Sequence, residues 1–143
     1  MAAYRSEGIG SLLRPDYLVE ARRQLDAGRL SPAEFKQIED RAVNDALALQ
    51  EAAGLDVLTD GEQRRYAFFG HLIEALDGFD KFGGWAIPFR NEQGEELIFK
   101  RPVVVEKLRW RRSMCGEEFT YLRARTKRPV KTTLISAQQA AAY

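Results

Sequence analysis

The stretch Leu55-Asp56-Val57-Leu58-Thr59-Asp60-Gly61-Glu62-Gln63-Arg64-Arg65 decides how the rest of the chain is interpreted. A short apolar segment runs directly into two carboxylates, a glycine and two guanidinium groups, which is typical of a buried β-strand that ends in a polar turn. In α/β proteins, ligands bind at the carboxyl ends of the strands. We therefore expect a functional site at Asp60, Glu62 and the two arginines.

The composition is that of an ordinary packed protein of 143 residues, with 45% apolar and 30% charged residues, and it predicts one domain over residues 1–143. The formal net charge of +1 gives no general attraction to nucleic acid or to an anionic membrane. The single cysteine, Cys115, excludes an intramolecular disulfide and indicates a reducing compartment. No apolar run approaches the roughly 20 residues that cross a bilayer, so we expect a cytoplasmic protein.

A long helix is predicted to lead into the Leu55 strand. Ser31-Pro32-Ala33-Glu34 supplies an N-cap serine, a proline at the first helical position and a glutamate at the third. Gly54 is a suitable C-cap. A shorter helix is expected from Pro15-Asp16 to Gly28. The predicted apolar stripe of the long helix comprises Phe35, Ile38, Ala42, Ala46, Leu49 and Ala53.

The order of the remaining elements predicts an α/β fold. Further strands are expected at residues 9–14, where the chain enters a loop at Gly10-Ser11, and at residues 129–135. Helices are expected at residues 66–76, ending at Asp77-Gly78, and at residues 116–126. Between them, residues 79–106 read as an antiparallel excursion around a turn from Asn91 to Gly94. Repeated alternation of strand and helix favours a parallel sheet covered by helices.

A closed (β/α)8 barrel takes about 250 residues, and only about three parallel strands are visible here. We therefore interpret the chain as the N-terminal part of a (β/α)8 barrel with a β-hairpin excursion.

Three segments, taken together, resemble the cobalamin-independent methionine synthase family. They are Ile9-Gly10-Ser11-Leu12-Leu13-Arg14-Pro15, then residues 50–62 with Arg65, and Pro129-Val130-Lys131-Thr132-Thr133-Leu134. Each motif is short. Their order and spacing, with Leu76-Asp77-Gly78-Phe79 and Gly84-Trp85 between them, make the set specific over nearly the whole chain.

The resemblance implies a zinc-dependent enzyme that moves a methyl group from 5-methyltetrahydrofolate to a thiol such as homocysteine, making methionine. A metal ion deprotonates a coordinating thiol, and the thiolate is the nucleophile. In the family, the loop equivalent to Ile9, Gly10 and Ser11 contacts the amino acid substrate, and the glutamate equivalent to Glu62 binds its amino group. The implied partners are thus a thiol amino acid and a folate methyl donor.

The zinc ligands of the family are a histidine, two cysteines and a glutamate on later strands. His71 and Cys115 match none of them, and a catalytic zinc site needs about three protein ligands. We therefore expect no metal site in this chain, zinc ligands beyond Tyr143, and no turnover by residues 1–143 alone.

Residue types alone leave alternatives open at each candidate. Asp60 and Glu62 also fit a solvated Asp-Gly turn. Arg65 matches a family arginine and could contact substrate or pair with these carboxylates. Trp85 is a candidate stacking surface for a pterin ring, although a place in the hairpin core is the favoured interpretation. Cys115 has no neighbouring histidine in the sequence and is expected to be inert.

Two other functions remain open at this point. One is a general acid–base barrel related to uroporphyrinogen decarboxylase, with Glu62 or Asp60 as the acid or base. The other is a truncated, non-catalytic paralogue that associates with partners through an exposed sheet edge.

Overall fold

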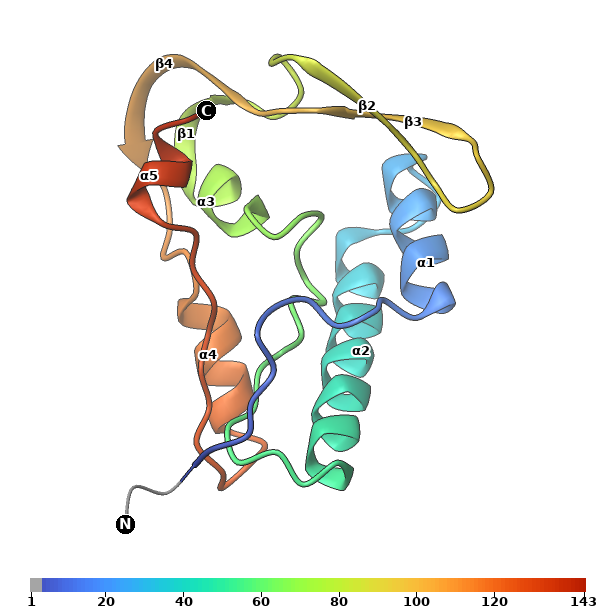
Figure 1. The fold of residues 1–143 in the computed structure, drawn as a ribbon, viewed down its shortest axis with the longest axis vertical. Helices are drawn as coiled ribbons and strands as arrows, with labels where there is room; N and C mark the ends of the chain where they lie inside the picture. Colours follow the sequence, from blue (N-terminus) through green and yellow to red (C-terminus); the bar gives the residue numbers. More distant parts are fainter. Residues whose placement is uncertain (1–3) are drawn as a thin grey trace. The chain divides into compact units, whose positions relative to one another are not determined.

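The computed structural model describes residues 4–143, which fall into two compact units. The first unit comprises the chain up to Phe68 together with Cys115–Thr133, and it contains α1 (Asp16–Asp26), α2 (Pro32–Ala52) and α4 (Gly116–Arg123) (Figure 1). The second unit comprises Phe69–Met114 and Leu134–Tyr143, and it contains α3 (Gly70–Ala75), β1 (Leu76–Asp80), β2 (Ala86–Arg90), β3 (Glu96–Lys100), β4 (Val103–Trp110) and α5 (Ala137–Ala140). Within the described residues, no helix is long and apolar enough to cross a membrane.

Helix α2 begins with the predicted capping box. The Ser31 hydroxyl accepts a hydrogen bond from the Glu34 amide at 3.3 Å, and the Glu34 carboxylate accepts one from the Ser31 amide at 3.0 Å. The C-cap is Ala53, and Gly54 follows it with a φ of +77°.

The predicted stripe of α2 is wrong in its last turns, because Leu49 is 64% exposed. The buried face comprises Phe35, Glu39, Ala42, Val43, Ala46, Leu47 and Gln50. Leu49 precedes Gln50 by one residue, a rotation of about 100°, and so it points away from this face.

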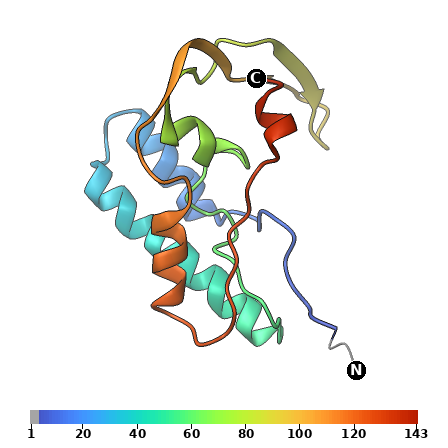
Figure 2. The same ribbon diagram turned by 90° about the vertical axis from the view of Figure 1, so that its left-hand side faces the viewer.

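Two apolar clusters hold the first unit together. The first joins α1 to α2, which lie side by side in Figures 1 and 2, and its buried residues are Leu18, Ala21, Phe35 and Ala42. The second comprises Val43 and Leu47 of α2, Leu122 of α4, and Leu58 from the segment before the Asp60–Arg65 turn. Leu58 is fully buried, so this cluster fixes the point at which the polar turn begins.

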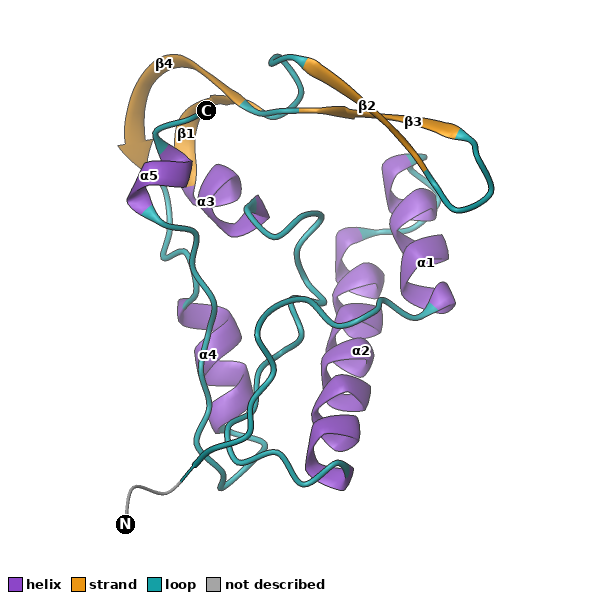
Figure 3. Ribbon diagram, viewed as in Figure 1, coloured by secondary structure: helices purple, strands orange, loops and turns teal. Residues whose placement is uncertain are grey.

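The three predicted parallel segments lie in parallel order, but their pairing is much shorter than predicted. Glu7 forms a parallel bridge with Val57, and Leu58 forms one with Val130. Each segment therefore pairs at isolated positions and is drawn as loop in Figure 3. The first bridge, at Glu7, lies before the strand predicted from Ile9, and Ile9 itself is 93% exposed. Glycines on both sides of Ile9 weaken an extended strand there. The fold is α/β, and a barrel stays a prediction.

The hairpin predicted around Asn91 to Gly94 is confirmed. Strands β2 and β3 pair antiparallel, from Ala86 opposite Lys100 to Arg90 opposite Glu96. At the turn, the Asn91 side chain accepts a hydrogen bond from the Glu95 amide at 2.8 Å, and Gly94 has a φ of +79°.

Two helix boundaries differ from prediction. The helix predicted over residues 66–76 occupies only Gly70–Ala75, and the one over 116–126 ends at Arg123. Asp77-Gly78 lies inside β1, which pairs antiparallel with β4. Gly78 has a φ of +103°, and a Cβ atom there would lie 2.9 Å from the Glu106 carbonyl oxygen. The register shifts at this close backbone approach, so Gly78 marks an irregularity within a strand.

Candidate functional site

The turn that follows Leu58 holds Glu62 in an unusual backbone conformation. Glu62 has a φ of +56°, and it is the one non-glycine residue with a positive φ in the described part of the chain. Such a conformation costs on the order of 1–3 kcal/mol and persists where the surrounding contacts enforce it. Here the Leu12 amide donates to the Gly61 carbonyl at 3.0 Å, and the Glu62 amide donates to the Asp60 carboxylate at 3.0 Å.

The Glu62 carboxylate joins the three parallel segments. Its side chain is buried, with 4% exposure for the whole residue. The Ser11 hydroxyl of the first segment donates to Oε2, and the Thr133 hydroxyl of the third donates to Oε1 at 2.5 Å. A carboxylate offers about four acceptor positions, so this one retains capacity for another donor.

Arg65 is shared between two buried carboxylates. Its Nε and Nη2 atoms donate to Glu118 of α4 at 3.1 and 2.6 Å, whereas Nη1 lies 3.4 Å from Glu62 Oε1. Nη1 and Nη2 also donate to the Thr133 hydroxyl and carbonyl oxygens, both at 3.0 Å. Burial by itself would lower the pKa of Arg65, but the hydrogen bonds and charge of Glu118 raise it above its ordinary value. Arg65 is therefore a fixed cation.

Glu62, Arg65 and Glu118 together contain two carboxylates and one guanidinium, and the charge of Arg14, whose guanidinium bonds carbonyl oxygens of the turn, also acts on Glu62. One guanidinium balances one carboxylate, and buried charges are stable when they are paired and hydrogen-bonded. The set therefore favours a ligand that brings a positive charge and hydrogen-bond donors, such as an ammonium group.

Asp60 is the most deeply buried of the predicted carboxylates, at 1% exposure. Its Oδ1 atom accepts the Glu62 amide, while Oδ2 has no hydrogen-bond partner among the described residues. Burial, and then the charge of Glu118, raise the pKa of Asp60 above its ordinary value. Asp60 therefore shapes the turn and holds a proton more tightly than a solvated aspartate does.

Helix α1 and the residue before its cap secure the backbone of the turn. Arg14 Nη2 donates to the carbonyl oxygens of Glu62 at 3.0 Å and Arg65 at 2.6 Å. Arg22 Nη2 donates to the Arg64 carbonyl oxygen at 3.2 Å. These contacts occupy carbonyl groups that a turn with a left-handed residue would otherwise leave exposed.

The structure brings together four of the predicted site residues, Ser11, Asp60, Glu62 and Arg65. Gly10 passes close by, since a Cβ atom there would lie 3.9 Å from Glu62 Oε1. The side chain of Ile9 is exposed, so any role for this residue falls to its backbone.

Three further residues of the site, Thr133, Glu118 and Arg14, were not predicted from the sequence. Thr133 lies within a predicted strand, but nothing in its neighbourhood marks it as polar lining. Glu118 stands 53 residues from Arg65, and no local pattern pairs them.

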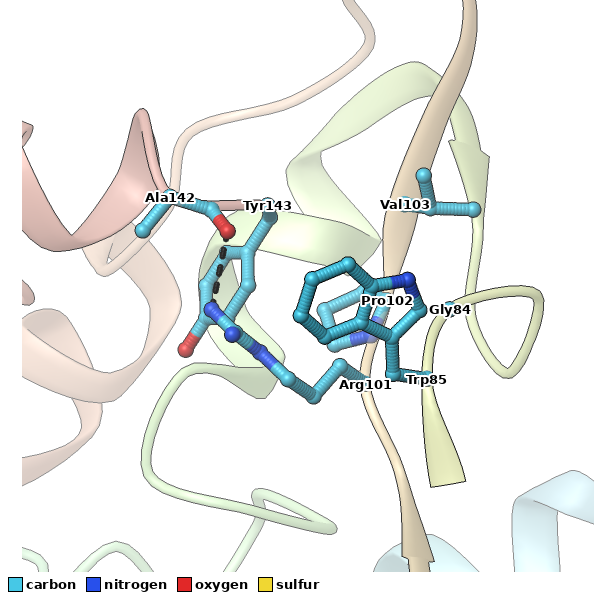
Figure 4. Close-up of a pocket in the computed structure, with 7 residues that line it drawn as sticks. All are labelled: Gly84, Trp85, Arg101, Pro102, Val103, Ala142 and Tyr143. Carbon is cyan, nitrogen blue, oxygen red and sulfur yellow. Dashed lines mark hydrogen bonds between the residues drawn. The ribbon is translucent and has the colours of Figure 1, made fainter. Parts of the chain in front are cut away.

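Trp85 belongs to the second unit, where the favoured core interpretation is wrong because its side chain is 81% exposed. It precedes β2, and the hairpin has too few layers to cover it. A cavity of about 260 Å³ is lined by Gly84, Trp85, Arg101, Pro102, Val103, Ala142 and Tyr143 (Figure 4). Arg101 Nη2 donates to the Ala142 carbonyl oxygen at 2.8 Å, shown as the dashed line.

The described residues do not fit a zinc site. No group of three or more His, Cys, Asp and Glu side chains in residues 4–143 is arranged to hold a metal ion. Burial, with the charge of Glu118, raises the pKa of Cys115 to about 11, so its sulfur is a protonated thiol at neutral pH. A thiol in this state is a poor metal ligand and a poor nucleophile.

Residues that meet at the ends of parallel segments define this chain as an α/β protein with a buried carboxylate site. Residues 6–138 match the catalytic domain of the cobalamin-independent synthases, and the chain belongs to that family.

Among its relatives, methionine synthase of Sulfurisphaera tokodaii is 34% identical over 116 residues, which are 81% of this chain and 32% of that protein. The 5-methyltetrahydropteroyltriglutamate–homocysteine methyltransferase of Streptomyces griseus is 32% identical over 88% of this chain and 16% of that protein. The chain thus spans a third or less of these relatives.

The fold is also similar to a solved structure. A B12-independent methionine synthase from Shewanella sp. W3-18-1, in complex with selenomethionine, matches with a TM-score of 0.68 and 26% identity. The match covers 91% of this chain and 37% of that protein.

Proposed function

We propose that this chain is the N-terminal part of a (β/α)8 barrel that transfers a methyl group to the thiol of an amino acid such as homocysteine. Membership of the family supports this reaction, as does the name of the Streptomyces griseus relative, which gives homocysteine as acceptor and a methyltetrahydropteroyl compound as donor. The observation that carries the proposal is the buried Glu62 carboxylate, which is hydrogen-bonded by Ser11 and Thr133 and shares Arg65 with a second carboxylate, Glu118.

In this proposal Glu62 binds the ammonium group of the amino acid. The contact is charge-assisted, and it orients the substrate for reaction at its far end. The Ser11 hydroxyl and the backbone of Ile9 and Gly10 bind the rest of the α-amino acid group. The selenomethionine complex of the Shewanella relative supports a ligand of this class, since selenomethionine carries the same ammonium and carboxylate groups.

In this proposal the zinc ligands would lie beyond Tyr143, since the described residues offer no group of donors that fits the ion. When bound, zinc supplies a thiolate at neutral pH. Residues 1–143 alone are then inactive. Trp85, with its exposed ring and the cavity beside it, is proposed as a stacking surface for the pterin of the methyl donor.

The test is a steady-state assay of the full-length protein with homocysteine and 5-methyltetrahydrofolate. Glu62→Gln keeps the size of the side chain but removes its charge, so the KM for homocysteine should rise roughly 10- to 100-fold, the equivalent of about 1.5–3 kcal/mol. The value of kcat should change less, since the contact is made in both the ground and transition states. The control is Glu117→Gln, an exposed residue of α4. An unchanged KM in Glu62→Gln removes Glu62 from the site.

One observation favours a second candidate, general acid–base chemistry at Asp60. A buried carboxyl with a raised pKa is the usual form of a catalytic acid. Adding a zinc chelator to the same assay distinguishes methyl transfer from acid–base chemistry at Asp60. Zinc-dependent methyl transfer would stop on chelation and return when zinc is restored, whereas zinc-independent turnover that Asp60→Asn abolishes would establish the acid–base function.

A further inference from the structure

Glu118 lies in the first turn of α4 and is 7% exposed, although its neighbour Glu117 is exposed. Its two carboxylate oxygens accept from Nε and Nη2 of Arg65, a bidentate contact along one edge of the guanidinium. Only the remaining nitrogen, Nη1, faces Glu62, and it does so at 3.4 Å. The stronger of the two ion pairs of Arg65 is thus made with Glu118.

We propose that Glu118 is a positioning residue that keeps the Glu62 carboxylate available to a cationic ligand by holding Arg65 along its other edge. The inference rests on the proposed function, in which that ligand is the ammonium group of an amino acid.

The role of Glu118 follows from the net charge of the set formed by Glu62, Arg65 and Glu118. With Glu118 in place, two carboxylates share one guanidinium, and the set carries a net charge of −1. Without Glu118, Arg65 alone would face Glu62, the set would be neutral, and the guanidinium could turn a full edge toward Glu62 in the bidentate geometry that arginine and carboxylate favour. An incoming ammonium group would then compete with a bound arginine.

The Thr133 hydroxyl connects the Arg65 guanidinium to the Glu62 carboxylate. It accepts from Arg65 Nη1 at 3.0 Å and donates to Glu62 Oε1 at 2.5 Å. The hydroxyl thus bonds both side chains, while the direct hydrogen bond from Arg65 Nη1 to Glu62 Oε1, at 3.4 Å, is longer than the usual charged hydrogen bond of about 2.7–2.9 Å.

The test measures binding of L-selenomethionine to the full-length protein by calorimetry. Glu118→Gln should weaken binding about tenfold, because Arg65 then neutralises Glu62. The double variant Arg65→Gln with Glu118→Gln restores the net charge of −1, and its affinity should return to within about threefold of the wild type. A purely structural role for Glu118 predicts no such recovery, since the double variant is further from the native packing.

Two controls accompany these variants. Glu117→Gln, one residue away on the same helix, should bind as the wild type does. The deaminated analogue 4-(methylseleno)butanoate has no ammonium group and is an anion, so its affinity should not fall in Glu118→Gln relative to the wild type.

The outcomes separate the two claims. If the wild type binds no L-selenomethionine, or Glu62→Gln binds it unchanged, the proposed function fails. If Glu62→Gln weakens binding while Glu118→Gln does not, or if the double variant binds no better than Glu118→Gln, the role of Glu118 is refuted. Circular dichroism checks each variant for folding. If Glu118→Gln does not fold, the test uses the double variant Arg65→Gln with Glu118→Gln. A loss of affinity for L-selenomethionine of more than tenfold in this double variant overturns the inference.

Discussion

Glu62 combines two properties that folding by itself does not favour, a left-handed backbone and a carboxylate taken almost completely out of water. Both are held by contacts from elsewhere in the unit. Ser11 and Thr133 hydrogen-bond the carboxylate, and Arg14 donates to the carbonyl oxygen of the same residue. A strained residue that several contacts enforce is typical of a site built for a ligand.

Asp60 provides a prediction at the same scale. Its raised pKa means that the folded protein binds this proton more tightly than the unfolded chain does. As pH rises from the ordinary pKa of an aspartate through the raised value, Asp60 ionises in a buried place and its contribution to stability is lost. Asp60→Asn keeps the acceptor for the Glu62 amide and cannot ionise.

The thermal midpoint of Asp60→Asn, relative to the wild type, should therefore be higher at pH 7 than at pH 3.5. The control is Asp56→Asn, where hydrogen bonds from Ser6 lower the pKa of an exposed aspartate, so the difference should run in the opposite direction. A midpoint difference for Asp60→Asn that is the same at both pH values contradicts the account.

Elements whose signals are local were predictable from the sequence. The start of α2 follows from Ser31-Pro32-Ala33-Glu34, and the hairpin follows from the Asn91 to Gly94 turn between two apolar runs. Strand β1 was not predictable in the same way. Leu76-Asp77-Gly78 reads as the end of a helix, and only pairing with a strand some thirty residues further on makes it extended. Propensity gives way to tertiary pairing there.

Gly78 gives a prediction at the scale of an element. Gly78→Ala should destabilise the second unit by roughly 2–4 kcal/mol, since it adds strain at positive φ and forces a Cβ atom against the backbone of β4. Guanidinium unfolding followed by tryptophan fluorescence reports on this unit, because Trp85 and Trp110 both belong to it.

Gly94→Ala is the matched control. It also has a positive φ, but no atom lies within 4 Å of the added Cβ, so it should cost only about 1–2 kcal/mol. Equal losses of unfolding free energy in Gly78→Ala and Gly94→Ala would show that the close approach of Gly78 to β4 does not contribute to the cost of the substitution.

At the scale of the first unit, the site exists because three segments lie in parallel order, even though their pairing is limited to isolated bridges. That order places Ser11, Glu62 and Thr133 together across separations of 51 and 71 residues. The sequence pointed to Ser11 and Glu62 through motifs that resemble a family. It did not point to Glu118, because the partner of a buried arginine is chosen by packing, and many glutamates in the chain are equivalent by pattern.

The central claim is that Glu62 anchors the ammonium group of an amino acid. A crystal structure of the full-length protein with L-selenomethionine, its selenium located by anomalous scattering, tests this most directly. The account predicts the ligand nitrogen about 2.7–3.2 Å from a Glu62 carboxylate oxygen, with Arg65 still paired along its edge to Glu118. A bound ligand whose nitrogen lies away from Glu62, with that carboxylate bonded only to Ser11, Thr133 and Arg65, would contradict it.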